Sequence, residues 1–200
     1  MLLDYNSIVQ KYQIILTGVI HVGGHTGEEI PLYRQQTNNI HIFEPLKECF
    51  DQIDENVKKY NTALGSKKTT LEFHVANNKQ SSSFLKPKTH IYEHSSVTFN
   101  ENRVVNLETL DSYGIVDCNL LNMDVQGYEL EVLKGAEHTL KHIDYIFTEV
   151  NEKELYENCV YMNELDEFLT DFKRVETAMT PMGWGDALYI RKSLFTQYEW

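Results

Sequence analysis

The fold is decided by residues 18–27, which read Gly-Val-Ile-His-Val-Gly-Gly-His-Thr-Gly. The apolar run at residues 18–22 is typical of a short buried strand, and two consecutive glycines end it. Residues 28–34 can continue as a helix, and residues 39–44 form a second β-rich run. A strand, a helix and a second strand in this order predict a parallel βαβ unit.

The same alternation continues along the chain. Apolar residues at helical spacing predict helices within residues 1–17, 46–60, 130–142 and 165–172. Short β-rich runs predict strands at residues 61–65, 120–125 and 145–150, and a closing hairpin from residues 174–179 and 187–190. Residues 71–107 have strand-like ends around a polar loop and are expected to form a variable insertion that contributes to specificity.

This pattern predicts a single α/β domain over residues 1–200. Parallel strands need crossover connections, and these are right-handed within one sheet. The expected architecture is therefore a doubly wound α/β sandwich, in which ligands bind at the carboxyl ends of the strands.

Composition excludes several classes of function. The chain has 18 Lys and Arg against 30 Asp and Glu, a net charge of −12 at pH 7, and such a surface repels nucleic-acid phosphates and anionic lipid. Three widely spaced cysteines predict neither a disulfide framework nor a zinc knuckle. With no signal peptide and no long apolar run, we expect a cytoplasmic protein without membrane insertion.

The glycine turn after the first strand is the first candidate site. Glycines let the backbone approach a ligand closely, and Glu44 ends the second strand, where a carboxylate can accept hydrogen bonds from a ribose diol. The full G-x-G-x-x-G pattern is absent, so a plain turn beside a surface acid is the alternative. Glu28 and Glu29 would oppose a pyrophosphate but tolerate a sulfonium or ammonium group, which disfavours a nicotinamide oxidoreductase.

The second candidate site lies where the fourth strand ends. Side chains alternate along a strand, so Asn122, Asp124 and Gln126 share one face, and Asp124 can project into the crevice. Glu149 and Asn151 end the next strand and would present oxygens to the same place. Such oxygen donors suit Mg²⁺, or a carboxylate base with a hydrogen-bond partner. A helix-capping role for Asp124 is the structural alternative.

Three motifs follow one another along the chain. They are Phe43-Glu44-Pro45, Thr109-Leu110-Asp111, and residues 124–136 with the pattern Asp-Val-x-Gly-x-Glu-x-x-Val-Leu-Lys-Gly-Ala. This order resembles the FkbM-type S-adenosylmethionine-dependent methyltransferases over most of residues 19–191. The resemblance implies a seven-stranded sheet with one antiparallel strand, S-adenosylmethionine as cofactor, and O-methylation of sugars, glycans or polyketide-like metabolites.

The resemblance also implies roles for individual residues. Glu44 would hold the ribose hydroxyls, and the catalytic pair Asp124 and Glu149 would lie near the transferred methyl group. If Mg²⁺ takes part, Asp124, Glu149 and Asn151 are its expected ligands. The expected cofactor-binding residues are His21, Gly23, Gly24, His25, Gly27, Glu44, Pro45, Ala63, Leu64, Ser82 and Asp124.

Four positions depart from the family pattern. His21 and His25 stand where the family usually has Asp and Asn, and Asn122 and Gln126 replace a usual Lys and Glu. If the usual Lys and Glu pair with one another, the two amides should keep that hydrogen bond and preserve the chemistry. If either charge is catalytic, the chain would be a cofactor-binding protein without turnover.

Acceptor binding is expected from the variable segments. Aromatic rings stack on the C–H faces of sugars, which favours Tyr92, Tyr128 and Trp184, with core packing as the alternative for each. His94 is expected beside them. Its spacing from His90 would also suit a metal, but without an evident third ligand a solvated pair is favoured.

The function that we expect is O-methylation of a sugar hydroxyl, with a deoxyhexose such as rhamnose in a glycan as the leading acceptor. Methylation of a polyketide-like small molecule is the alternative substrate class. The abrupt start on a helix leaves open a fusion to other glycan-modifying domains.

Overall fold

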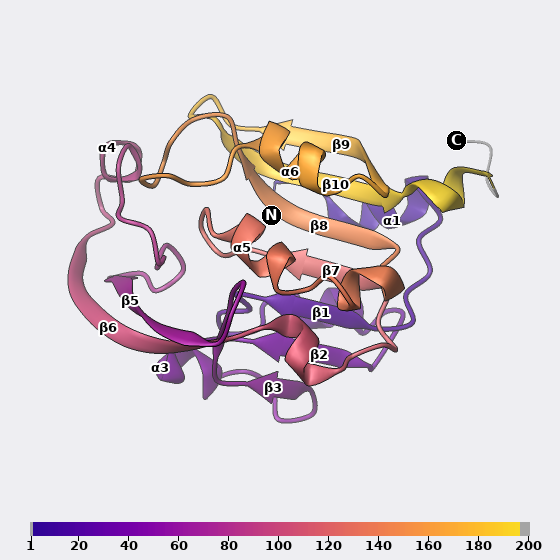
Figure 1. Ribbon diagram of the computed structural model, residues 1–200, viewed down its shortest axis with the longest axis horizontal. Helices are drawn as coiled ribbons and strands as arrows, with labels where there is room; N and C mark the ends of the chain where they lie inside the picture. The colour runs from indigo at the N-terminus through magenta and orange to yellow at the C-terminus, as the bar shows by residue number, and fades with distance from the viewer. Residues whose placement is uncertain (1, 197–200) are drawn as a thin grey trace.

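Seven strands form the central sheet: β1 (Val19–Val22), β2 (Ile40–Phe43), β3 (Lys58–Tyr60), β7 (Leu120–Met123), β8 (Tyr145–Asn151), β9 (Phe172–Met179) and β10 (Trp184–Arg191). Their order is β3-β2-β1-β7-β8-β10-β9 (Figure 1). The neighbours from β3 to β8 are parallel, and β10 is antiparallel to both β8 and β9. The computed structural model, which describes residues 2–196, thus confirms the doubly wound sandwich with one antiparallel strand.

Helices cover both faces of this sheet, among them α1 (Tyr5–Lys11), α2 (Ile30–Tyr33), α5 (Glu129–Lys134) and α6 (Met162–Phe168), and α3 (Lys47–Phe50) follows β2. Helix α4 (His90–Glu93) lies away from the central sheet (Figure 1). Leu133 of α5 and Leu165 of α6 belong to one apolar cluster, whereas Ile8 of α1 and Tyr33 of α2 belong to a second. Every residue of β1, β2 and β7 is buried. This explains why these strands are nearly continuous apolar runs without alternation.

The insertion predicted at residues 71–107 supplies most of a second, smaller sheet. It contains β4 (Ala63–Leu64), β5 (Thr69–Ala76) and β6 (Phe99–Glu108) in the order β4-β6-β5. In Figure 1, β5 and β6 curve away from the central sheet and lead to α4. The expected strand-like ends are therefore present, with the polar segment of the insertion between them.

The third strand is the main error of the sequence-based assignment. The predicted helix at residues 46–60 ends at Phe50, and its last three residues are β3. The predicted strand at residues 61–65 instead contains β4, which pairs with β6 of the smaller sheet. Edge strand β3 is held by pairing with β2 and by Tyr60, whose ring stacks on Phe43 at 4.5 Å. Such long-range contacts override the local helical spacing.

The predicted helix at residues 130–142 is only partly confirmed, and the predicted hairpin is confirmed. The helix predicted at residues 130–142 is divided into α5 and a 3₁₀ turn at Thr139–His142, whereas the closing hairpin is confirmed as β9 and β10. Within residues 2–196, no helix combines the length and apolar composition needed to cross a bilayer.

Candidate functional site

The carboxyl ends of β1, β2, β7 and β8 meet at one edge of the sheet, where the structure has a cleft with two compartments. We call the first the apolar compartment; its walls include Phe43, Ala63, Leu64, Phe84 and Tyr128. We call the second the polar chamber; its walls include His21, Glu28, Glu29, His94, Glu149 and Trp184. Four residues line both, namely Gly23, His25, Gln80 and Asp124. The two compartments therefore adjoin at the glycine turn and Asp124.

Close packing of the turn on the end of β7 explains the need for glycine at position 23. Gly23 has a φ of +80°, and a Cβ atom there would lie 1.9 Å from the carbonyl oxygen of Asp124. The Asp124 N–H donates in turn to the Val22 carbonyl oxygen at 3.0 Å. The backbone of Asp124 is thereby fixed directly beside the turn.

Glu44 connects the ends of β1 and β2. Its side chain is only 5% exposed, and its two carboxylate oxygens accept the backbone N–H groups of His25 at 2.9 Å and Leu46 at 2.7 Å. Burial raises the pKa of Glu44 to about 7, and the two backbone hydrogen bonds oppose this shift. Each oxygen keeps a further lone pair for a donor in the apolar compartment.

Gln126 joins the two acids that the sequence predicts to be catalytic. Its amide nitrogen donates to Asp124 Oδ1 and to Glu149 Oε2, at 2.7 Å in each case. Burial, followed by the neighbouring charge of Asp124, raises the pKa of Glu149 well above its usual range. Asp124 is exposed in the cleft whereas Glu149 is buried. Asp124 is therefore the accessible acid of the pair, and burial favours the protonated form of Glu149.

Glu129 is a site residue that the sequence reasoning missed. It is fully buried, and its Oε1 accepts the N–H groups of Val125 at 3.2 Å and Gly127 at 3.1 Å. The turn between them contains Gln126 at a φ of +55°, so Glu129 holds a strained turn that carries the Gln126 amide. An acid two residues after Gly127, at the start of an apolar helix, is the signal that would have found it.

A separate network connects Asn122 and His21. The Asn122 amide donates to Tyr33 Oη at 2.6 Å, and this hydroxyl lies 3.2 Å from His21 Nδ1. Burial lowers the pKa of His21, which favours the neutral ring, and a hydrogen bond joins its Nδ1 to the Tyr33 hydroxyl. Asn122 and Gln126 thus have different partners, and the expectation that the two amides bond to one another is wrong.

The structure brings together most of the predicted cofactor-binding residues. The apolar compartment is lined by Gly23, His25, Glu44, Pro45, Ala63, Leu64, Ser82 and Asp124, and the polar chamber adds His21 and Gly24. Gly27 is buried, packs against Ile30 of α2 and lines neither compartment.

The predicted acceptor-binding residues separate. His94 and Trp184 line the polar chamber, with ring centroids 6.2 Å apart. Tyr128 instead lies in the apolar compartment, where its ring packs on Phe84 at 5.1 Å. Tyr92 is 81% exposed and lines neither compartment, since its helix α4 presents it to solvent.

The predicted Mg²⁺ ligands are only partly assembled. Asp124 and Glu149 adjoin, but the Gln126 amide lies between them. Asn151 is buried on β8, and neither compartment is lined by it. The Mg²⁺ site stays a prediction.

Asp186 also lines the polar chamber and was missed. It pairs with Glu149 across β8 and β10, and its position two residues after Trp184 places both on one face of β10. Strand alternation from Trp184 is the signal that would have identified it.

A family model described as the Methyltransferase FkbM domain matches residues 21–175. The chain belongs to the FkbM methyltransferase family. This FkbM chain is 27% identical over 184 residues to the 2-O-methyltransferase NoeI of Sinorhizobium fredii, a match that covers 82% of this chain and 75% of that protein.

Two solved structures share the FkbM chain's fold. Methyltransferase FkbM from Methylobacillus flagellatus matches with a TM-score of 0.58 and 13% identity, over 87% of this chain but only 43% of that one. A SAM-dependent methyltransferase from Aquifex aeolicus matches with a TM-score of 0.52 and 12% identity, over 95% of this chain and 90% of that one. These matches confirm the Rossmann-like methyltransferase fold.

Proposed function

We propose that this FkbM-family chain is an S-adenosylmethionine-dependent O-methyltransferase whose acceptor is a hydroxyl of a sugar or glycan. The observation that carries the proposal is the position of Asp124. This exposed carboxylate lies where the apolar compartment meets the polar chamber. A group bound in the first compartment can therefore meet an acceptor bound in the second beside a proton-accepting side chain.

The residues of the apolar compartment fit the nucleoside of the cofactor. Ala63, Leu64 and Phe84 offer flat apolar walls to an adenine, and Glu44 can accept hydrogen bonds from both ribose hydroxyls. The close packing around Gly23 leaves no space for a Cβ atom, so the backbone of the turn itself forms part of the compartment wall. Glu28 and Glu29 line the polar chamber, and their negative charges favour the sulfonium and the ammonium group of the cofactor.

S-adenosylmethionine supplies a methyl group on a positively charged sulfur. An oxygen nucleophile attacks the methyl carbon in line, and the sulfur is the leaving group. In our proposal, Asp124 accepts the proton of the acceptor hydroxyl. Gln126 orients the Asp124 carboxylate through its amide N–H, and burial favours the protonated form of the neighbouring Glu149. We favour this direct role over Mg²⁺ coordination because the amide already occupies the space between the two acids.

The polar chamber supports a sugar as the acceptor. Trp184 and His94 offer aromatic faces, and amide and carboxylate groups such as Gln80 and Asp186 offer hydrogen-bond partners. Its lining, as far as residues 2–196 describe it, contains no Lys or Arg, which disfavours phosphorylated sugars and nucleic acid. The relative described as a 2-O-methyltransferase supports transfer to oxygen, and a deoxyhexose such as rhamnose is our leading acceptor.

Two alternatives share this cleft. A polyketide-like acceptor is favoured if the aromatic faces matter more than the polar groups. A cofactor-binding protein without turnover is favoured by the four departures from the family pattern, above all Asn122 and Gln126.

Calorimetric titration with S-adenosylhomocysteine, followed by mass spectrometry of a panel of sugars incubated with S-adenosylmethionine, tests the proposal. We expect binding and the gain of one CH₂ unit on a deoxyhexose, with unchanged rates in EDTA. Absence of cofactor binding overturns the proposal. Binding without transfer to any sugar or polyketide selects the non-catalytic alternative, and loss of transfer in EDTA that Mg²⁺ restores selects the metal.

A further inference from the structure

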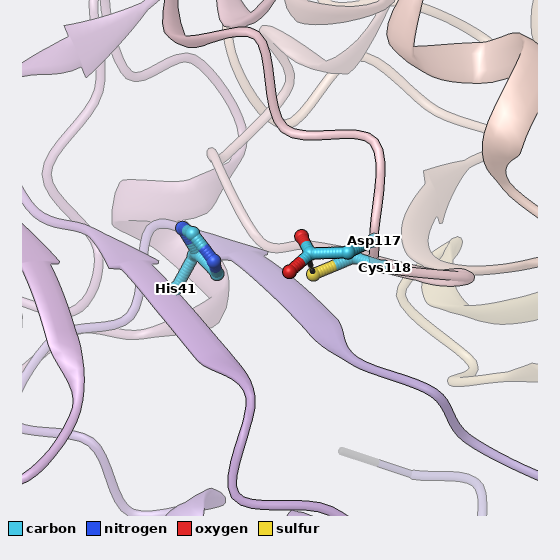
Figure 2. Close-up of side chains that lie close together, drawn as sticks. All are labelled: His41, Asp117 and Cys118. Carbon is cyan, nitrogen blue, oxygen red and sulfur yellow. Dashed lines mark hydrogen bonds between the residues drawn. The ribbon is translucent and has the colours of Figure 1, made fainter.

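Three metal-ligating side chains gather at the opposite edge of the central sheet, where its parallel strands begin. His41 is the second residue of β2, and Asp117 and Cys118 lie in the loop that leads into β7. One nitrogen, one oxygen and one sulfur ligand atom lie within 4.8 Å of one another. Figure 2 shows the carboxylate and the thiol on one side and the imidazole facing them. Among residues 2–196, this is the one such group of three His, Cys, Asp or Glu side chains.

Neighbouring groups set the protonation of the imidazole. Lys58 Nζ lies 3.1 Å from His41 Nε2, and since an ammonium group only donates, Nε2 must be the unprotonated acceptor. The ring proton is then on Nδ1, which lies 3.1 Å from Tyr60 Oη and donates to it. Metal-binding histidines have this arrangement, with a lone pair toward the metal and the other N–H held by a second group.

The Lys58 ammonium is a resident cation in this cluster. It also donates to Asn39 Oδ1 at 3.1 Å, and the Asn39 amide nitrogen lies 3.5 Å from Cys118 Sγ. Lys58 belongs to edge strand β3 and is exposed, so its side chain can turn into solvent. A dication can therefore take the place of the ammonium.

We propose that His41, Asp117 and Cys118 bind a transition-metal dication, best matched by Zn²⁺. Mixed nitrogen, oxygen and sulfur donors suit zinc, whereas Mg²⁺ and Ca²⁺ take oxygen ligands. Bond lengths of about 2.0–2.3 Å put tetrahedral ligand atoms about 3.5 Å apart, so atoms that lie up to 4.8 Å apart must approach by at most about 1.3 Å. Coordination takes the proton from the Cys118 thiol and releases it to solvent, and water completes the fourth position.

Burial and access both fit this site. His41 is 4% exposed and Cys118 is 2% exposed, so burial holds two of the ligands in place, one on β2 and one just before β7. Asp117 is exposed, so an ion can reach the site from solvent, and the Asp117 side chain can move toward the other two ligands. The bound ion would link β2 to the start of β7, the two strands that flank β1, and would stabilise the fold without contacting the cleft.

Calorimetric titration of the chelator-treated full chain with ZnCl₂ tests the site. We expect one equivalent to bind and to raise the melting temperature. Asp117→Asn, His41→Ala and Cys118→Ser should each weaken binding by about 10- to 100-fold. Lys58→Met, which removes the competing ammonium from an exposed position, should strengthen it by about tenfold. Co²⁺ should give a thiolate charge-transfer band that Cys118→Ser abolishes.

Matched controls are Cys49→Ser and His74→Ala, which remove a thiol and an imidazole elsewhere and should leave zinc binding unchanged. The double variant His90→Asn/His94→Asn removes the histidine pair near the polar chamber and should also have no effect. Absence of stoichiometric zinc binding overturns the proposal. So does zinc binding that survives Asp117→Asn and Cys118→Ser, or a Lys58→Met protein that binds no tighter.

Discussion

The backbone N–H of His25 donates to Oε2 of Glu44 over 2.9 Å, so the turn after β1 is fastened to the acid at the end of β2. Burial raises the pKa of that acid to about 7. A ribose diol donates hydrogen bonds, and it therefore binds the ionised carboxylate better than the protonated form.

We predict that affinity for S-adenosylhomocysteine rises with pH between roughly pH 6 and pH 8, as Glu44 ionises. Glu44→Gln should weaken binding by about 10- to 100-fold and flatten this pH profile. Calorimetry across the range measures both effects, and the exposed Glu137→Gln is the control. Parallel profiles for the wild type and Glu44→Gln would show that another group titrates.

Asp124→Asn should slow methyl transfer by about 10²- to 10⁴-fold, because the amide cannot accept the hydroxyl proton. Its shape is nearly unchanged, so affinity for S-adenosylhomocysteine should stay within about threefold. Single-turnover rates and calorimetry separate the two quantities. The exposed Asp171→Asn is the matched control, and an active Asp124→Asn protein would remove the proposed base.

Glu149→Gln should make stability less dependent on pH. The folded-state pKa of Glu149 lies well above its unfolded value, so the folded protein keeps a proton that the unfolded chain releases above about pH 4.5. The free energy of unfolding of the wild type therefore falls as pH rises from about 4.5 toward the folded-state pKa of Glu149. In Glu149→Gln, the glutamine keeps the hydrogen bond from Gln126 and has no proton to lose. Melting temperatures from pH 5 to 9 test this. Identical slopes for both proteins would mean that Glu149 is ionised when folded.

Tyr156→Phe should loosen the insertion. The Tyr156 hydroxyl lies 2.8 Å from the Ser81 carbonyl oxygen and 2.7 Å from Gln126 Oε1, so it joins the insertion to the turn after β7. We expect a loss of about 0.5–1.5 kcal/mol in the free energy of unfolding, and faster amide exchange within residues 77–98. The exposed Tyr92→Phe should change neither quantity. An unchanged exchange rate in Tyr156→Phe would show that other contacts hold the insertion.

Trp184→Ala should raise KM for the sugar acceptor by about tenfold, since a stacking face is lost. Affinity for S-adenosylhomocysteine should be unchanged, and Trp184→Phe should restore much of the acceptor binding. Initial rates over a range of acceptor concentrations give KM. A change in cofactor affinity alone would mean that Trp184 contacts the cofactor and not the acceptor.

The sequence was sufficient for the parts of the fold that depend on local pattern. Buried runs such as residues 18–22 end in glycine or an acid, and parallel topology then brings those ends to one edge. Edge strand β3 was missed because Lys58 and Lys59 are not typical strand residues, and pairing with β2 decides their conformation.

Within the site, residues at strand ends were easier to place than residues that depend on distant segments. Glu44 and Asp124 follow from strand polarity alone. Asp186 reaches the chamber only through the antiparallel register of β10 against β8. Tyr92 and Tyr128 were assigned by residue type, but the rotation of α4 and the packing of Phe84 decide where their rings lie.

The two compartments of the cleft share the glycine turn, Asp124 and part of the insertion, but each also has walls that the other lacks. His90 and His94 reach the polar chamber from the insertion and Trp184 from the closing hairpin, whereas the apolar compartment takes Glu44 and Ala63 from the first half of the chain. If the proposed sites are correct, mutation of His90, His94 or Trp184 can alter which acceptor is recognised and leave the walls of the apolar compartment intact. Such modularity lets one scaffold diversify its substrates during evolution without first losing its methyl donor.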